Sequence, residues 1–95
     1  MLHTLMHSPY YSDLNTLLLL LTAEDDLLLL QDGVLGALEG SSALSQLLTS
    51  PATLWVLTED VTARGLGGQI SAKVRPVDYT GFVALTEKHQ QQMTW

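Results

Sequence analysis

The chain of 95 residues contains no cysteine. This absence excludes disulfide bonds, thiolate metal sites and any thiol, persulfide or sulfenate intermediate on the chain itself. Whatever chemistry the chain takes part in therefore proceeds without a thiol nucleophile of its own.

Basic residues are scarce. The chain has four Lys and Arg against ten Asp and Glu, which gives a formal net charge of −6. The basic residues are Arg64, Lys73, Arg75 and Lys88, and they form no cluster beyond the pair of Lys73 and Arg75. Nucleic acids and anionic lipid surfaces are bound through clustered cations. We therefore expect no direct binding of RNA or DNA and no binding to a membrane surface.

No apolar run is long enough to cross a membrane. The longest uncharged apolar stretch, residues 14–23, is followed by three acidic residues, whereas a spanning helix needs about 18–20 apolar residues. No basic residue precedes this run and no small-residue cleavage site follows it, so it does not have the pattern of a signal peptide. We expect a cytoplasmic protein.

Leucine is abundant. The sequence contains 21 leucines and is 46% hydrophobic but only 15% charged. This composition predicts one packed domain over residues 1–95 and argues against disorder. So many apolar side chains present more surface than so short a chain can easily bury, which is a first indication of a protein partner.

Strand and helix patterns alternate along the chain. Strands are predicted around residues 1–7, 26–31, 53–57 and 74–77, with a short edge strand at the final Met-Thr-Trp. The middle two are apolar without alternation, which is typical of parallel strands covered on both faces. Helices are predicted between the strands, with Ser12, Ser42, Thr58 and either Asp78 or Thr80 as N-caps. We expect a small three-layer α/β/α domain with a four- to five-stranded, mostly parallel sheet.

The first helical stretch carries more leucine than one face needs. Leucines at positions 14, 17, 18 and 21 have the i, i+3, i+4, i+7 spacing of a single face. Leu19 and Leu20 fall outside it. They are either scattered surface leucines, which are normal, or the contact of this helix with another chain.

Polar residues follow the second and third predicted strands, where an open parallel sheet keeps its ligand crevice. They are Gln31, Asp32, Glu59 and Asp60, with Arg64 one helical turn further on. Asp32 could position a ligand, but an aspartate before a helix is more often its cap, with Gly33 supplying a tight turn. Glu59 and Asp60 could act as an acid/base pair, but adjacent residues of a first helical turn point to different sides, and the helix dipole alone favours acids there.

Neither the histidines nor the glycine-rich segment has the spacing of a metal or cofactor site. His3 and His7 on one strand would lie roughly 13 Å apart, too far to share a metal ion. His89 is most simply a partly buried or interface histidine. The GLGGQ segment lacks the lysine of a phosphate loop and the spacing of a dinucleotide fingerprint. We expect neither a metal nor a cofactor.

Four stretches carry a resemblance to a known family. They are MLHTL (1–5), DDLLLLQDGV (25–34), EDVTARGLGGQIS (59–71) and DYTGFVALTEKHQQQMTW (78–95). Together, in this order and over the whole chain, they resemble the TusB/DsrH family, whose fold is DsrE/F/H-like.

The resemblance implies a function. TusB-like members are subunits of TusBCD, a dimer of heterotrimers with TusC-like and TusD-like sister subunits in the bacterial cytoplasm. This complex relays persulfide sulfur toward 2-thiolation of the tRNA wobble uridine. It receives sulfur from a TusA-like carrier and passes it to a TusE-like carrier. The chain is then expected to be an accessory subunit and not an enzyme.

Under this resemblance, the absence of cysteine bears on which branch of the family the chain resembles and on whether it can carry sulfur. Alignment on Arg64–Gly65 would place the sulfur-carrying cysteine of the sister subunit near Leu57. The DsrH relatives typically keep a cysteine, so its absence favours the TusB branch. No residue is expected to be catalytic. The residues expected to shape the crevice or a subunit contact are Leu19, Leu20, Gln31, Asp32, Glu59, Asp60 and Arg64.

Two other hypotheses remain open from the sequence. The chain could be a small stand-alone enzyme that uses Asp32 with His3 or His7. It could also be an interaction module outside the sulfur relay.

Overall fold

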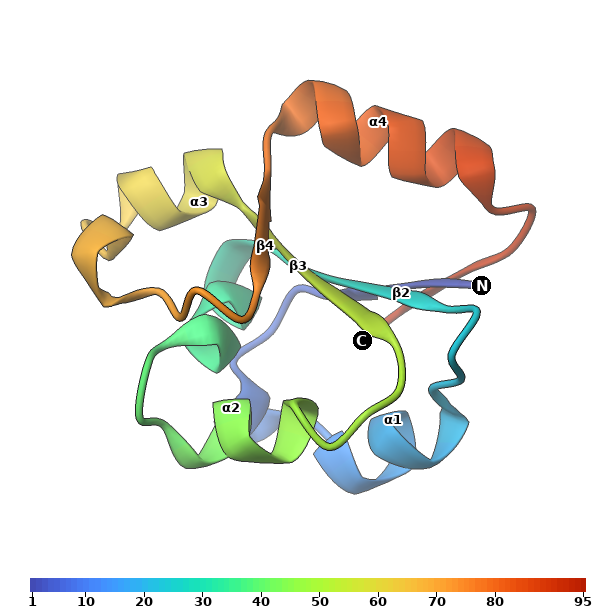
Figure 1. Cartoon of the computed structure of the whole chain (residues 1–95), viewed down its shortest axis with the longest axis horizontal. Helices are drawn as coiled ribbons and strands as arrows, with labels where there is room; N and C mark the ends of the chain where they lie inside the picture. The colour runs from blue at the N-terminus through green and yellow to red at the C-terminus, as the bar shows by residue number, and fades with distance from the viewer.

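The computed structural model describes all 95 residues as a five-stranded sheet with helices on both faces (Figure 1). The sheet order is β4-β3-β2-β1-β5, and every neighbouring pair is parallel. The strands are β1 (Leu2–Leu5), β2 (Asp26–Leu29), β3 (Thr53–Leu57), β4 (Arg75–Val77) and β5 (Gln92–Thr94). The parallel sheet and the C-terminal edge strand predicted from the sequence are both confirmed.

The connections between strands are helical. The α-helices are α1 (Leu14–Leu20), α2 (Ser42–Leu47), α3 (Thr58–Ala63) and α4 (Tyr79–Lys88), and the short 3-10 helices are η1 (Pro9–Tyr11), η2 (Gln31–Ala37) and η3 (Gly67–Gln69). In Figure 1, α1 and α2 lie below the sheet and α4 lies above it. α3 lies at the carboxyl end of β3, and its buried residue Val61 belongs to the same cluster as the buried leucines of α1 and α2. None of the helices has the length and hydropathy that crossing a bilayer requires.

Continuous hydrophobicity along the central strands reflects a core on each face of the sheet. Leu27 and Leu29 of β2 belong to a cluster of 16 buried residues that includes the buried leucines of α1 and α2. Leu28 points the other way, into a cluster of five that includes Leu85 of α4. Because side chains alternate along a strand, both sets must be apolar when both faces are covered. The face beneath α4 has much the smaller core.

The leucines of α1 divide as their spacing predicts. Leu14, Leu17 and Leu21 are buried, and Leu18 packs against the same cluster. Leu19 and Leu20 point away from it, with 86% and 46% of their surfaces exposed. The fold of this chain therefore does not use these two side chains.

The predicted caps were wrong by a residue at three helices. Asp13, not Ser12, caps α1 through its bond from the Thr16 N–H, and Ser41, not Ser42, caps α2. Thr58 lies inside α3, whose N-cap position is held by a leucine without a side-chain bond. At α4 one of the two predicted candidates, Asp78, is the cap. Each cap sits where the backbone leaves the extended region, a boundary that sequence places only to within a residue or two.

Candidate functional site: a cleft at the carboxyl ends of the strands

A cleft of about 500 Å³ opens beside the carboxyl ends of β1, β2 and β3. Tyr79 and Phe82 of α4 form one wall. The remaining lining includes residues that follow each strand or lie near its end: Thr4, Met6, Leu30, Gln31, Leu57, Glu59, Asp60, Gln92 and Thr94. This is the crevice expected of an open parallel sheet, and it contains three of the predicted residues, Gln31, Glu59 and Asp60.

The turn after β2 has an unusual backbone. Gln31 has a φ of +52°, the left-handed region that a residue with a side chain rarely adopts. Its backbone N–H donates to Oδ2 of Asp60 across the cleft at 2.6 Å. This bond holds η2 against α3. Because such backbone strain persists only where the surroundings enforce it, the turn is a fixed part of the cleft rim.

Gly33 serves a different purpose from the one predicted. It does not supply the positive φ of the turn, which falls on Gln31. A Cβ at Gly33 would lie 1.9 Å from the carbonyl oxygen of Leu5. Glycine is therefore required here because η2 passes directly over the backbone of β1.

Asp32 is not a helix cap, contrary to the sequence interpretation. It lies within the first turn of η2, whose N-cap residue, Leu30, makes no side-chain cap bond. The Asp32 carboxylate instead accepts from Nη2 of Arg64 at 3.0 Å and from Nε at 3.3 Å. The pair joins η2 to the end of α3 outside the cleft and adds a second link between the two elements.

Glu59 and Asp60 do not form a carboxylate pair. Oε2 of Glu59 accepts from the backbone N–H of Tyr79 at 3.1 Å, at the start of α4, whereas Asp60 bonds to Gln31. The two carboxylates thus attach α3 to two different elements. Their part in the cleft is to fix its walls, as their adjacent positions in a helical turn suggested.

The cleft combines an apolar base with an acidic rim. Leu57, at the end of β3, is 6% exposed and packs with the cluster beneath α4. Glu59 and Asp60 lie on the rim, and no lysine or arginine lines the cleft. An anionic group would be repelled here, whereas a neutral or apolar side chain would fit.

The predicted histidines are separated in the structure. His7 Nδ1 lies 3.1 Å from the Trp95 carbonyl oxygen, and His3 contacts Asp25. No group of three or more histidine or acidic side chains lies close enough to hold a metal ion. Asp32, outside the cleft, is paired with Arg64 and forms no hydrogen bond or ion pair with either histidine.

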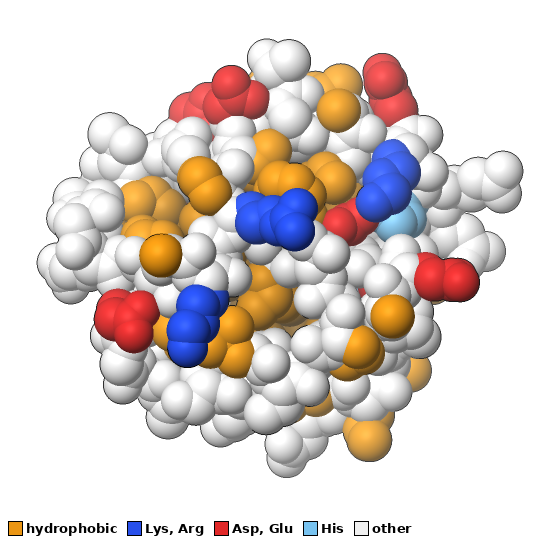
Figure 2. Space-filling view, in the orientation of Figure 1, with side chains coloured by type: hydrophobic (Ala, Val, Ile, Leu, Met, Phe, Trp, Pro, Cys, Tyr) orange, Lys and Arg blue, Asp and Glu red, His pale blue; other side chains and the backbone are white.

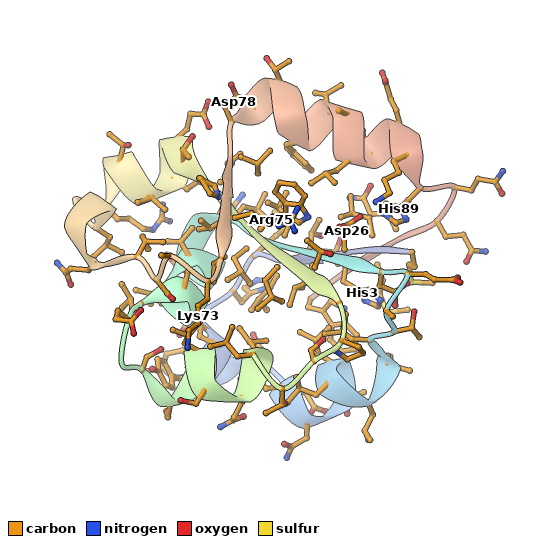
Figure 3. All side chains as sticks on the ribbon, viewed as in Figure 1. His3, Asp26, Lys73, Arg75, Asp78 and His89 are labelled. Carbon is orange, nitrogen blue, oxygen red and sulfur yellow. The ribbon has the colours of Figure 1, made fainter.

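Sequence reasoning missed a second polar cluster at the amino end of β2. Asp26 has a side chain only 3% exposed, and it accepts from Trp55 Nε1 at 2.8 Å, Lys88 Nζ at 2.9 Å and His89 Nε2 at 2.7 Å. Figure 3 shows Asp26 close to His89, with Asp78 at the far end of α4. Burial opposes ionisation of this carboxyl, but its three donors outweigh burial and hold the pKa of Asp26 below its ordinary value.

The neighbouring Asp25 makes a similar network with His3. Burial raises the pKa of Asp25, but bonds from the Met1 amine and the Thr22 N–H outweigh it, so the pKa lies below its ordinary value. Burial lowers the pKa of His3, and Asp25 restores only part of it. His3 is thus neutral at pH 7. Its Nδ1 accepts from Trp95 Nε1, which is a donor only, so the proton lies on Nε2 facing Asp25.

One signal in the sequence could have revealed the Asp26 cluster. The strand at 26–31 was interpreted as covered on both faces, yet it begins with an aspartate. A carboxylate in such a strand must find buried donors, because an unpaired buried charge is too costly. The identity of those donors, 62 and 63 residues away, could not be read from the sequence.

Comparison with known proteins assigns the chain to a family. Residues 7–92 match the family model described as DsrH like protein. Protein TusB of Yersinia pestis (strain Pestoides F) and Protein TusB of Yersinia pseudotuberculosis serotype O:1b are each 58% identical over 95 residues, covering all of both chains. The chain belongs to the TusB/DsrH family.

Solved structures share the fold of this TusB/DsrH-family chain. The solution structure of protein Tm0979 from Thermotoga maritima superposes with a TM-score of 0.66 at 27% identity, covering 96% of this chain and 97% of that one. The crystal structure of the ychN protein from E. coli gives a TM-score of 0.76 at 17% identity, covering 99% and 97%. The small three-layer α/β fold is therefore confirmed.

Within the TusB/DsrH family, the position of Leu57 becomes informative. Leu57, the residue on which the sequence resemblance focuses attention, lies in the base of the cleft. The base of the cleft therefore holds a buried hydrocarbon side chain at this position.

Proposed function

We propose that the chain is the TusB subunit of a TusBCD complex, which relays persulfide sulfur in the cytoplasm toward 2-thiouridine at the tRNA wobble position. In this role it is an accessory subunit without a catalytic residue. Family membership supports a part in sulfur relay. The observation that carries the accessory role is Leu57 in the base of an intact cleft, in a chain without cysteine.

The electrostatics of the cleft support the same role. A persulfide or thiolate is an anion at neutral pH and is stabilised by nearby cations or donors. Here Glu59 and Asp60 lie on the rim and Arg64 is already engaged by Asp32. A transferable sulfur atom has neither an attachment point nor a favourable field in this cleft. The thiols of the relay then belong to the TusD-like sister and to the TusA-like and TusE-like carriers.

The net charge of −6 is consistent with a place away from the tRNA. Recognition of the nucleic acid would fall to the downstream partners of the relay. The TusB subunit would contribute shape and contacts to the TusC-like and TusD-like subunits.

Co-expression of the chain with its TusC-like and TusD-like sisters tests this function. We expect an equimolar complex and, after loading from a TusA-like donor, intact masses that show added sulfur on the TusD-like chain and none on this one. Omitting this chain should reduce sulfur transfer from the remaining pair to a TusE-like acceptor. Normal assembly and transfer without this chain, while it stays monomeric, would contradict the proposal.

A further inference from the structure

The surface formed by η1, α1 and α2 carries almost no charge. We call this surface the neutral layer, comprising residues 9–20 and 42–47. Its only charged residue is Asp13, and the chain has none between residues 40 and 58. In Figure 2, the lowest part of the molecule, where α1 and α2 lie, shows neither red nor blue side chains. The exposed side chains of α2 and of the first half of α1 are polar but uncharged.

Large hydrophobic side chains are exposed on or beside this layer. Tyr10 and Tyr11 of η1, Leu19 and Leu20 of α1, and Leu48 after α2 make up five of the eight exposed large hydrophobic residues of the chain. The core does not need them, because the buried leucines of α1 and α2 already cover the sheet. Exposed apolar residues combined with depletion of charge are the composition of an interface core.

The opposite side of the molecule has a different surface. Glu59 and Asp60 of α3 and Glu87 and Lys88 of α4 lie on this side, and Arg64 follows directly after α3. These charged groups keep the side with the cleft hydrated. The two sides of this small domain thus differ in charge, although Tyr79, Val83 and Met93 are also exposed on α4 and β5.

The size of the neutral layer suits a stable interface. The chain measures 32 × 29 × 21 Å along its principal axes, and the layer extends along one side of it. Such a side offers an area on the order of the roughly 800 Å² per partner that stable complexes bury. Contact with a second copy is disfavoured, because it would bring together two chains that each carry a net charge of −6.

We propose that the neutral layer is the surface through which this chain contacts a sister subunit of the same α/β fold, against a likewise uncharged helical face. The proposal rests on the proposed function and adds to it the face of this chain that is used. Leu19 is the most exposed leucine of this layer. The cleft on the other side of the sheet remains open.

Two matched substitutions test this assignment. Leu19→Glu and Val83→Glu each place one new carboxylate on an exposed helical position, on α1 and α4 respectively. In co-expression with both sisters, Leu19→Glu should reduce recovery of this chain in the complex at least tenfold. Val83→Glu should leave recovery unchanged. Equal circular dichroism spectra and unfolding midpoints of the isolated variants would show that both remain folded.

Each alternative outcome of this experiment overturns a different statement. If the wild-type chain forms no complex with the sisters, the proposed function fails and this assignment with it. If wild type and Leu19→Glu assemble equally well, only the assignment of the face fails. If light scattering shows that the isolated chain is a dimer and Leu19→Glu makes it a monomer, the occupant is a second copy and not a sister subunit.

Discussion

Leu57 and its neighbours decide what the cleft can do. The side chain is buried at the end of β3, and the next turn of chain places Glu59 and Asp60 on the same cleft. A thiol in place of Leu57 would be surrounded by hydrocarbon and carboxylates, both of which disfavour its ionised form.

Leu57→Cys should therefore not become a reactive sulfur carrier. We expect its thiol pKa to lie above about 8.5 and its alkylation by iodoacetamide at pH 7 to be on the order of tenfold slower than that of an exposed Gln69→Cys control. The dependence of alkylation rate on pH gives the pKa directly. A thiol that reacts faster than the control would show that the cleft stabilises anions.

At Gly33 the backbone of η2 packs directly against the backbone of β1. Gly33→Ala should lower the free energy of unfolding by about 3 kcal/mol, because the added methyl group would overlap the Leu5 carbonyl and force η2 away from β1. Urea unfolding of the purified chain measures the change. Gly68→Ala is the matched control, since its Cβ would meet nothing within 4 Å, and it should change stability by less than about 0.5 kcal/mol.

At the scale of elements, α4 is the longest helix but is shallowly packed. Leu85 is its one buried side chain, and the hydrophobic cluster between α4 and the sheet has only five residues. Charged contacts fix both of its ends. Glu59 binds the N–H of Tyr79 at the start, and Asp26 binds Lys88 and His89 at the finish.

Asp26→Asn should weaken the attachment of the C-terminal end of α4 to the sheet, and the loss of stability should depend on pH. The folded-state pKa of Asp26 lies below the value of about 3.9 expected for the unfolded chain. The ionised Asp26 carboxylate therefore stabilises the fold fully at pH values above the unfolded-state pKa, and this contribution is lost as the pH falls through the folded-state pKa. We expect Asp26→Asn to cost about 3 kcal/mol at pH 7, since it leaves Lys88 and His89 without their anion.

The cost of Asp26→Asn should shrink as the pH approaches 3. Urea midpoints measured from pH 7 to pH 3 for both chains check this. Glu87→Gln removes an exposed carboxylate and serves as the control, with little change at any pH. A cost for Asp26→Asn that stays constant over this range would mean that the carboxylate is not the stabilising group.

The order and type of the elements could be predicted from the sequence, and the polar contacts between them only in part. Unbroken apolar runs such as 27–30 indicated strands covered on both faces, because side-chain alternation is a local property. The bond between Asp60 and the Gln31 N–H depends on how η2 and α3 pack against each other. The Asp26 network joins residues more than 60 positions apart. Such contacts are set by the packed fold and leave little trace in neighbouring residues.

At the scale of the whole molecule, charge is divided between surfaces. Nine of the ten acidic residues and all four basic residues lie outside the neutral layer, whose only charged residue is Asp13. The molecule as a whole repels polyanions, and no cluster of cations offsets that repulsion.

The purified chain should accordingly not bind tRNA. In filter-binding or electrophoretic assays at 50 mM salt, where phosphate contacts are strongest, we expect no retention of tRNA at micromolar protein. The complete relay with its tRNA-modifying partner is the positive control. Salt-sensitive binding by this chain alone would require a cationic surface that the fold does not display.

Pro76 in the middle of β4 has a consequence for how chains of this shape coexist in a cell. β4 is an edge strand of three residues, and a proline there has no N–H to offer a further strand. Copies of a chain with an unprotected edge could otherwise join edge to edge and grow into open ribbons. The proline thus removes a hydrogen bond that a strand adding at the β4 edge would need, and it disfavours open-ended growth from that edge.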